Sequence, residues 1–213
     1  DDEQKRRHFR QLQSNPNLVF THDGMITIPW LPDCWIRPNM RKSARREEPD
    51  LWAAAAETLG LHRLLSMPAG LFLEGGDVMP LCYGGHRALL VGFGPRTSEE
   101  SLHHLRANLV RDELVDEIVG VHLAPWRLNI DGCLFPVSAD LFVTNRDSVL
   151  GGVVLDRHGT RSIDPYAHFA RHGFDFIEVS RDESFLQQVC NFCCLGPRRL
   201  VAYGMNERVN RIL

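Results

Sequence analysis

The sequence predicts an α/β fold in a single domain over residues 1–213. Short apolar runs rich in Val, Ile, Leu and Phe alternate with polar segments of helical periodicity. No stretch rich in Gly, Ser or Pro divides the chain. A spacing of strand, strand, helix and strand recurs about three or four times, which suggests an internal ββαβ repeat, although an irregular α+β domain would explain the same runs.

The individual elements follow from these runs. Strands are expected at 18–20, 25–28, 71–73, 88–92, 117–122, 133–137, 140–143, 152–155, 174–179 and 200–203. Helices are expected at 47–59, 98–110 and 162–172, with a last one that starts at Asn206. The helix at 98–110 has the clearest pattern, because Ser98 can cap it and Leu102 and Leu105 follow with helical spacing.

The composition excludes several classes of protein. Lys and Arg number 24 against 27 Asp and Glu, so a net charge of −3 leaves no broad basic face for nucleic acid. No apolar run reaches the ~18 residues that a membrane span needs. The six cysteines lack the regular spacing of a secreted disulfide framework, which predicts a reducing, cytoplasmic setting. The start at Asp1, with neither an initiator methionine nor a signal-peptide pattern, suggests a processed or trimmed end.

An acidic, glycine-rich turn is the first candidate for function. Residues 72–78, Phe-Leu-Glu-Gly-Gly-Asp-Val, end an apolar run with an acid, two glycines and a second acid. The glycines let the backbone turn tightly beside a ligand, so Glu74 and Asp77 can point into one cleft. Such turns are also common on protein surfaces, so this motif depends on the segments around it.

Three such segments occur in the chain. They are Asn-Pro-Asn-Leu-Val-Phe-Thr-His-Asp at 15–23, Gly-Phe-Gly-Pro-Arg-Thr-Ser at 92–98 and Asn-Ile-Asp-Gly-Cys-Leu-Phe at 129–135. With the acidic turn, the set resembles the guanidino-group modifying superfamily of arginine deiminases, dimethylarginine dimethylaminohydrolases and amidinotransferases. The resemblance implies the pentein fold, an α/β propeller of five ββαβ modules around a central site. It runs from about Asn15 onward, and the propeller is expected to be incomplete at the C-terminus.

The resemblance also assigns roles to single residues. Asp23 matches the aspartate that grips the guanidinium, and Asp131 matches a second grip, in the family's His-x-Asp motif. Glu74 matches the glutamate that assists the catalytic histidine and faces the substrate, with Asp77 as a further substrate-binding acid. Arg96 matches the arginine that binds the substrate carboxylate in deiminases of free arginine.

The chemistry of a guanidinium explains these residue types. A planar cation with five N–H donors is recognised best by carboxylates in its plane. In the family, a cysteine thiolate attacks the central carbon, a histidine passes a proton to the departing amine, and an amidino-thioether forms. Water resolves it in hydrolases and an amine in transferases. The expected partner is therefore a small guanidine such as arginine, and neither a cofactor nor a metal is implied.

Two features depart from the family pattern. Asn129 stands in the catalytic position of the expected histidine, and an amide does not titrate near neutral pH. Losing a general acid or base costs ~10²–10⁴ in rate. His122 is a conceivable substitute, although a histidine at a strand end is usually just partly exposed. The family's nucleophile follows the last helix, so it is expected to lie beyond Leu213.

The cysteines that are present do not replace that nucleophile convincingly. Cys190, Cys193 and Cys194 fall in an apolar run that we expect to be a buried strand or turn. A zinc site there would need a second pair of ligands, which the sequence lacks. Cys133 would share a face with Asp131 only if no bulge interrupts the strand.

The basic run at 41–46, followed by Glu47 and Glu48, is expected to be an exposed charge cluster at the entry of a helix. Related sequences, however, carry an Arg-x-x-Glu near the substrate at this point.

Three functions fit these features. The first is an enzyme acting on arginine or a related guanidine, as hydrolase or amidinotransferase. The second is a binding module that keeps the acids but has lost catalysis, and the third is a scaffold. Clustered acids favour the first two because their repulsion calls for a cation. Asn129 favours the second, but a single codon change would convert His to Asn, so the enzyme stays ahead. A homo-oligomer is compatible with either.

Overall fold

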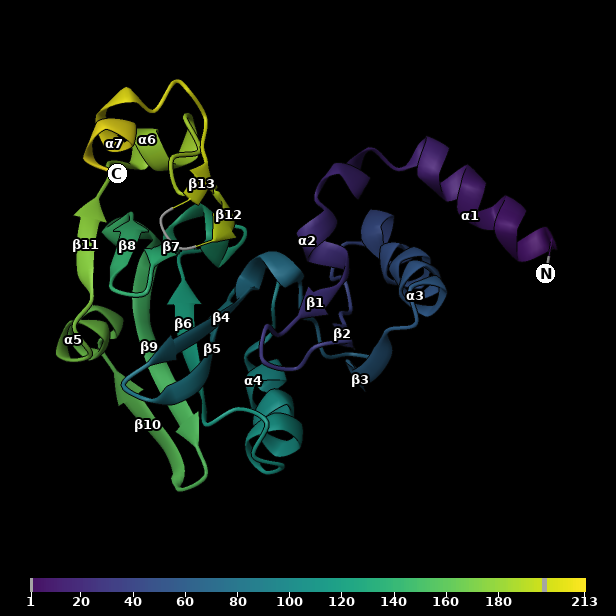
Figure 1. Ribbon diagram of the computed structural model, residues 1–213, viewed down its shortest axis with the longest axis horizontal. Coiled ribbons are helices and arrows are strands. Elements are labelled where there is room, and N and C mark those ends of the chain that lie inside the picture. Colours follow the sequence, from purple (N-terminus) through teal and green to yellow (C-terminus); the bar gives the residue numbers. More distant parts are fainter. Residues whose placement is uncertain (1, 197–198) are drawn as a thin grey trace.

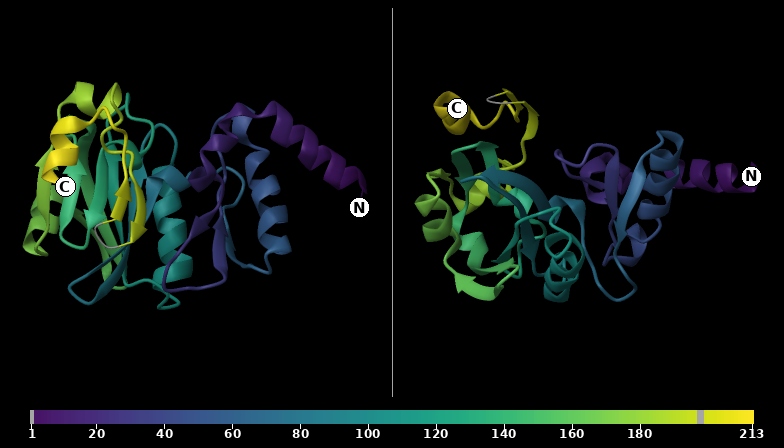
Figure 2. Two further views of the ribbon diagram at one scale, coloured as in Figure 1. Left: turned by 45° about the horizontal axis from the view of Figure 1, so that its top comes forward. Right: turned by 60° about the horizontal axis from the view of Figure 1, so that its bottom comes forward.

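A computed structural model describes residues 2–196 and 199–213. It shows a mixed α/β fold whose described strands form sheets of three, five, three and two strands, so the predicted fold class is confirmed. Figure 1 shows α1 (Asp2–Ser14) projecting from one end of the molecule, and the C-terminus lies at the other end. Two further views agree on this arrangement (Figure 2). Within the described residues, no helix is long and apolar enough to cross a membrane.

The first ββαβ unit follows the N-terminal helices. The short strands β1 (Ile26–Thr27) and β2 (Cys34–Arg37) pair antiparallel. Helix α3 (Glu48–Thr58) then returns the chain to β3 (His62–Ser66), which pairs parallel with β2. Two antiparallel strands and a helical crossover to a parallel third strand are the pattern expected from the sequence.

The second unit forms the centre of the molecule. Strands β4 (Val78–Tyr83) and β5 (His86–Phe93) make an antiparallel hairpin. Helix α4 (Glu99–Leu105) continues as a π-helical turn, η4 (Arg106–Val110), and leads to β6 (Glu117–Leu123), which is parallel to β5. The same ββαβ order therefore recurs.

The third unit is interrupted by a hairpin that joins the central sheet. Strands β7 (Leu134–Ser138) and β8 (Leu141–Thr144) pair antiparallel, and β11 (Asp175–Glu178) pairs parallel with β8 after helix α5 (Pro165–Arg171). Between them, β9 (Val149–Asp156) and β10 (Gly159–Ile163) extend the five-stranded sheet through β6.

The remaining elements are short. They are η1 (Pro16–Val19), α2 (Thr21–Gly24), η2 (Ser43–Arg45), η3 (Gly75–Asp77), η5 (Ile130–Gly132), η6 (Arg146–Ser148), α6 (Arg181–Phe185), β12 (Cys193–Gly196), β13 (Arg199–Val201) and α7 (Glu207–Ile212). The antiparallel pair β12 and β13, followed by α7, repeats the first three elements of the ββαβ order.

Strand β5, an inner strand of the five-stranded sheet, contributes to the core on both faces of that sheet. Leu89 and Val91 pack into one hydrophobic cluster, while Ala88 and Leu90 pack into a second cluster. Because side chains alternate along a strand, the two clusters lie on opposite faces of the sheet. A strand covered on both faces has an unbroken apolar sequence, which is why its position was predictable.

Three expected elements differ in the structure. Residues 18–20 are not a strand, because Asn15 accepts a hydrogen bond from Asn17 N and Pro16 favours a helical turn. At 71–73, Leu73 makes just an isolated bridge with Asn39. Helix α5 starts three residues later than expected, because the Asp164 side chain caps it.

Several strands were not expected. Edge strand β4 contains Pro80, which obscures its pattern but is tolerated at a sheet edge. Strands β2 and β3 are short, and β3 has no buried residue. In β12, Cys193 and Cys194 are exposed, so the expectation of a buried run there is wrong for these two residues.

Close packing at Gly75 gives a test of how the first two units join. A Cβ at this position would lie 1.8 Å from the carbonyl oxygen of His22, so only glycine lets η3 approach α2. We expect Gly75→Ala to lower the free energy of unfolding by about 1–3 kcal/mol. Urea unfolding would measure it, with Gly204→Ala as the control, because a Cβ at Gly204 meets no atom within 4 Å. Equal stability of the two variants would contradict this account of the contact.

Candidate functional site

Four acidic side chains expected from the sequence come together where η3 and η5 meet α2. Asp23 comes from α2, Glu74 precedes η3, Asp77 ends η3 and Asp131 lies within η5. These turns contact one another across the end of the central sheet.

Gly76 is the point around which two of the carboxylates gather. Its backbone N–H donates to Asp23 Oδ1 at 2.8 Å. A Cβ on Gly76 would lie 2.6 Å from Asp23 Oδ1 and 2.8 Å from Asp131 Oδ2. Asp23 and Asp131 therefore face the same glycine from two different segments. The lack of a side chain at Gly76 leaves them room to approach.

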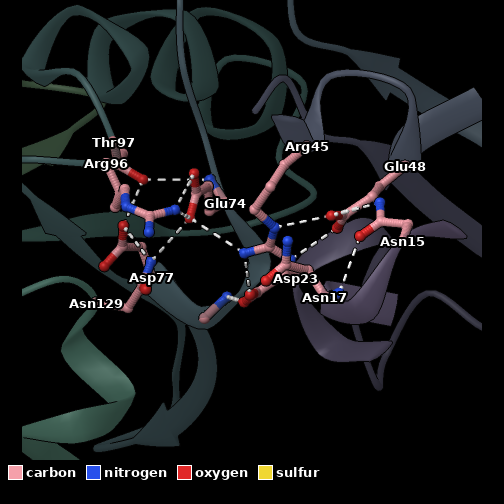
Figure 3. A network of polar contacts seen from close by, with 11 residues as sticks. Asn15, Asn17, Asp23, Arg45, Glu48, Glu74, Asp77, Arg96, Thr97 and Asn129 are labelled. Atoms are coloured by element: carbon pink, nitrogen blue, oxygen red, sulfur yellow. Dashed lines mark hydrogen bonds and ion pairs between the residues drawn. The ribbon is translucent and has the colours of Figure 1, made fainter. Parts of the chain in front are cut away.

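Glu74 is fully buried and lies within ion-pair distance of two arginines. Arg96 Nη1 lies 3.1 Å from Oε1 and 3.0 Å from Oε2, and Arg45 Nη1 lies 3.8 Å from Oε2 (Figure 3). Arg96, expected to bind a substrate carboxylate, thus contacts this glutamate in the ligand-free protein. Its Nε is buried and has no partner among the described residues. That unused donor points to unfilled hydrogen-bonding capacity beside Glu74.

Asp77 fastens the two turns to each other. It accepts hydrogen bonds from Thr97 Oγ1 at 2.6 Å, Asn129 Nδ2 at 3.1 Å and the backbone N–H of Ile130 at 2.9 Å. Burial raises the pKa of this carboxyl well above its usual range, although the hydrogen bonds from Thr97 and Ile130 oppose the shift. Its oxygens are engaged by protein donors, so the geometry favours a role in holding Asn129 and η5 in place.

Arg45 and Glu48 form a buried ion pair, although the basic run at 41–46 was expected to be exposed. Arg45 Nε and Nη2 donate to Glu48 Oε1 and Oε2 at 2.9 and 2.7 Å, and Nη1 donates to Asp23 Oδ2 at 2.8 Å (Figure 3). Asn15 Nδ2 adds a hydrogen bond to Glu48 at 3.1 Å. Burial alone would lower the pKa of Arg45, but the hydrogen bonds to Glu48 and Asp23 raise it above its ordinary value.

The expectation of an exposed charge cluster at 41–46 is therefore wrong for Arg45, which is 6% exposed. Arg41, Lys42 and Arg46 do lie at the surface. The available signal was the Arg-x-x-Glu spacing, because residues three apart at a helix start can face the same side.

Asp131 is the acid with the least direct compensation. Burial raises its pKa to about 7, and the nearby charges of Asp23 and Glu74 act in the same direction. The backbone N–H of Gly132 and the charge of Arg127 partly oppose this shift. A cation placed beside Asp131 would favour its ionised form.

The model of the arginine deiminase family matches residues 2–213. The chain belongs to the arginine deiminase family. No curated protein matches the chain.

Solved structures share the fold of this member of the arginine deiminase family. ArgZ, an arginine dihydrolase from the ornithine-ammonia cycle in cyanobacteria, is 17% identical with a TM-score of 0.69, over 98% of this chain and 33% of ArgZ. DDAH from Pseudomonas aeruginosa, a cysteine-to-serine variant complexed with citrulline, is 18% identical with a TM-score of 0.67. That match covers 99% of this chain and 75% of DDAH.

AgrE, solved as a complex of a cysteine-to-alanine variant with L-arginine, is 19% identical with a TM-score of 0.63. The match covers 90% of this chain and 28% of AgrE. These likenesses show the pentein-type fold that the sequence predicted. The chain thus spans about a third of the length of ArgZ and less of AgrE.

Asn129, at the position where the resemblance leads one to expect a histidine, contacts two of the carboxylates. Asn129 Nδ2 donates to Asp77 at 3.1 Å and lies 3.4 Å from Glu74 Oε2. The amide thus ties two carboxylates together. His122 does not join them, because it is exposed and stacks on Phe93 with ring centroids 5.0 Å apart.

The buried cysteines lie in the core. Cys133 is fully buried in the second hydrophobic cluster, and burial raises the pKa of its thiol well above the usual value. Asp131 lies within η5 and β7 begins only after Cys133, so strand alternation does not relate the two side chains. Burial raises the pKa of the Cys190 thiol to about 12. In both residues burial thus disfavours the thiolate form that a nucleophile requires.

The raised pKa of Asp131 predicts how stability depends on pH. Between about pH 4 and pH 7 the folded state keeps a proton that the unfolded state has lost, so the free energy of unfolding should fall as pH rises through this window. The shift corresponds to no more than about 4 kcal/mol. Asp131→Asn should flatten the fall in urea unfolding from pH 4 to pH 8, with a remainder from Asp77. The control is Asp175→Asn, an exposed aspartate of β11. A wild-type slope in Asp131→Asn would contradict the shift.

Proposed function

We propose that this protein binds the guanidinium group of arginine or a related small guanidine. We propose further that this chain is part of an enzyme. The enzyme modifies the guanidinium through a covalent amidino-cysteine intermediate, as a guanidine hydrolase or an amidinotransferase. Membership of the arginine deiminase family supports the proposal. So does the likeness of the fold to ArgZ, DDAH and AgrE, whose structures include complexes with substrate, citrulline and L-arginine.

The observation that carries the proposal is the excess of carboxylates in the cluster. Five acids contribute, namely Asp23, Glu48, Glu74, Asp77 and Asp131, against three guanidinium groups, those of Arg45 and Arg96 in ion pairs and that of Arg127 near Asp131. Gathering like charges costs free energy unless cations balance them or protons neutralise them. A bound guanidinium would supply a further cation, with planar donors suited to Asp23 and Asp131 around Gly76.

The residues of this chain would divide the work as follows. Asp23 and Asp131 would grip the guanidinium, and Glu74 would face it with Arg96 alongside. Arg96 Nε is a free donor for the carboxylate of a substrate such as arginine. The covalent step requires a cysteine thiolate and a group that protonates the leaving amine. The amide of Asn129 cannot take the second role by titration.

A second candidate is a guanidine-binding module without catalysis. Asn129 favours it, because its amide bridges Glu74 and Asp77 where an enzyme of this family is expected to place a histidine. In either case the six unpaired cysteines support a reducing setting such as the cytoplasm.

Binding of arginine is the direct test of the shared part of both candidates. We expect calorimetry at pH 8 to show that arginine binds, because this pH lies above the raised pKa of Asp131, and that citrulline binds far more weakly, because it is similar in shape but uncharged. Asp23→Asn should weaken arginine binding by about tenfold or more, as expected for a lost charge-assisted hydrogen bond. Asp140→Asn, an exposed acid outside the site, is the control. Equal affinity for arginine and citrulline would rule out a guanidinium site.

Turnover separates the enzyme from the binding module. In the protein extended past Leu213 to the segment expected to carry the nucleophilic cysteine, we expect Asn129→His to raise the rate of arginine modification by ~10²–10⁴ over the same protein with Asn129, because it restores a general acid and base. Analysis for citrulline, ornithine, ammonia and exchanged amidino groups would also identify the reaction. Asn129→Ala controls for simple loss of the amide. Binding without product in the extended protein and in its Asn129→His variant would leave the binding module as the function.

A further inference from the structure

Arg127 is a buried cation next to the proposed site, and none of the roles above includes it. It lies in the loop between β6 and η5, is 6% exposed, and its backbone N–H donates to the carbonyl of Ala124 at 2.9 Å. Arginine stays charged when buried, so its position has electrostatic consequences. Among residues 2–196 and 199–213, no carboxylate forms an ion pair with it.

The guanidinium of Arg127 is held directly against the η5 turn. Its Nη2 donates to Ser184 Oγ at 2.7 Å, and this hydroxyl donates to the carbonyl of Gly132 at 2.7 Å. A Cβ on Gly132 would lie 2.6 Å from Nη1 of Arg127. Gly132 therefore lets the guanidinium approach the backbone immediately after Asp131. Ser184 is 1% exposed, so α6 locks this contact from outside.

Two aromatic rings complete the enclosure of Arg127. Its guanidinium carbon lies 5.3 Å from the centroid of Trp126 and 5.7 Å from that of Phe185. These contacts favour the cation and exclude water from part of its surface. A charge with few water neighbours acts more strongly on nearby groups than an exposed one.

Arg127 is one of several charges that act on the ionisation of Asp131. Asp23 from α2 and Glu74 beside η3 oppose its ionisation. Asp77, at the end of η3, also lies within electrostatic range of Asp131. On the other side, Arg127 and the backbone N–H of Gly132 lower the pKa of Asp131.

We propose that Arg127 is a positioning residue for Asp131: locked to the η5 turn by Ser184, its charge favours the ionised form of the Asp131 carboxylate that a guanidinium ligand would contact. The ligand in this statement rests on the proposed function. The effect of Arg127 on Asp131 does not, because it operates in the ligand-free protein. A group that merely packed α6 against η5 would not need a charge at this place.

The first test follows the Asp131 carboxyl by ¹³C NMR through a pH titration of the ligand-free protein, with the signal assigned by its loss in Asp131→Asn. We expect a midpoint near 7 in wild type. Arg127→Met should raise it by about one unit or more, because an opposite charge is lost, and Arg127→Lys should keep it closer to the wild-type value. Ser184→Ala should raise it less than Arg127→Met, because the charge remains but is no longer fixed.

An unchanged midpoint in a folded Arg127→Met protein, judged by circular dichroism, would overturn the proposal. If Arg127→Met does not fold, Ser184→Ala decides. A raised midpoint in that folded variant supports the role of the lock, and an unchanged midpoint overturns it.

The second test measures arginine affinity by calorimetry from pH 5.5 to pH 9. Arg127→Met should bind about fivefold more weakly near pH 7 and recover towards pH 9, since a one-unit rise from a midpoint near 7 lowers the ionised fraction at pH 7 from about one half to about one tenth. A purely structural role would weaken binding equally at every pH, which would contradict the proposal. If wild type binds no guanidine at all, the proposed function fails, and the ligand-free titration still decides the role of Arg127.

Discussion

The buried guanidinium of Arg45 is the interaction on which the site depends. It contacts Asp23 and Glu48 directly and lies within ion-pair distance of Glu74, so it joins α2 and α3 to the turn that precedes the central hairpin. Removing one partner from such a group leaves uncompensated charge in a region that water barely reaches. The spacing of the first two ββαβ units is thus coupled to the charge balance of the acids.

The same network leaves one acid on its own. Asp23 uses Oδ2 for Arg45 and Oδ1 for the backbone of Gly76, and Glu74 is held by Arg96. Asp131 has no direct ion pair among the described residues, and its pKa is correspondingly high. The acids of the cluster therefore differ in how far arginines of the protein balance their charge. Asp23 and Glu74 are paired with arginines of the protein, whereas Asp131 has no such pair in the described part of the chain and is left to interact with what enters the site.

Much of the architecture could be predicted because local sequence patterns indicate its strands and helices. The unbroken apolar run of β5 and the periodic leucines of α4 depend on few distant contacts. The acidic motifs also indicated which carboxylates would meet. For Arg45 and Glu48 the Arg-x-x-Glu spacing was the one local signal. It did not decide their place, because a charged helix start looks alike in sequence whether solvent or a buried acid faces it. Cys133 was ambiguous for a similar reason, since only the η5 turn decides its side.

The edge of the central sheet has a consequence beyond the site. Strand β4 forms one border of the five-stranded sheet, and Pro80 lies in its middle. Proline has no N–H to offer, and its presence on a border strand is one of the features that discourage another chain from adding there. The hairpin is thereby protected against growth into a continuous intermolecular sheet, the route by which exposed strands seed aggregates. Copies of this protein that associate in an orderly way would be expected to meet through another surface.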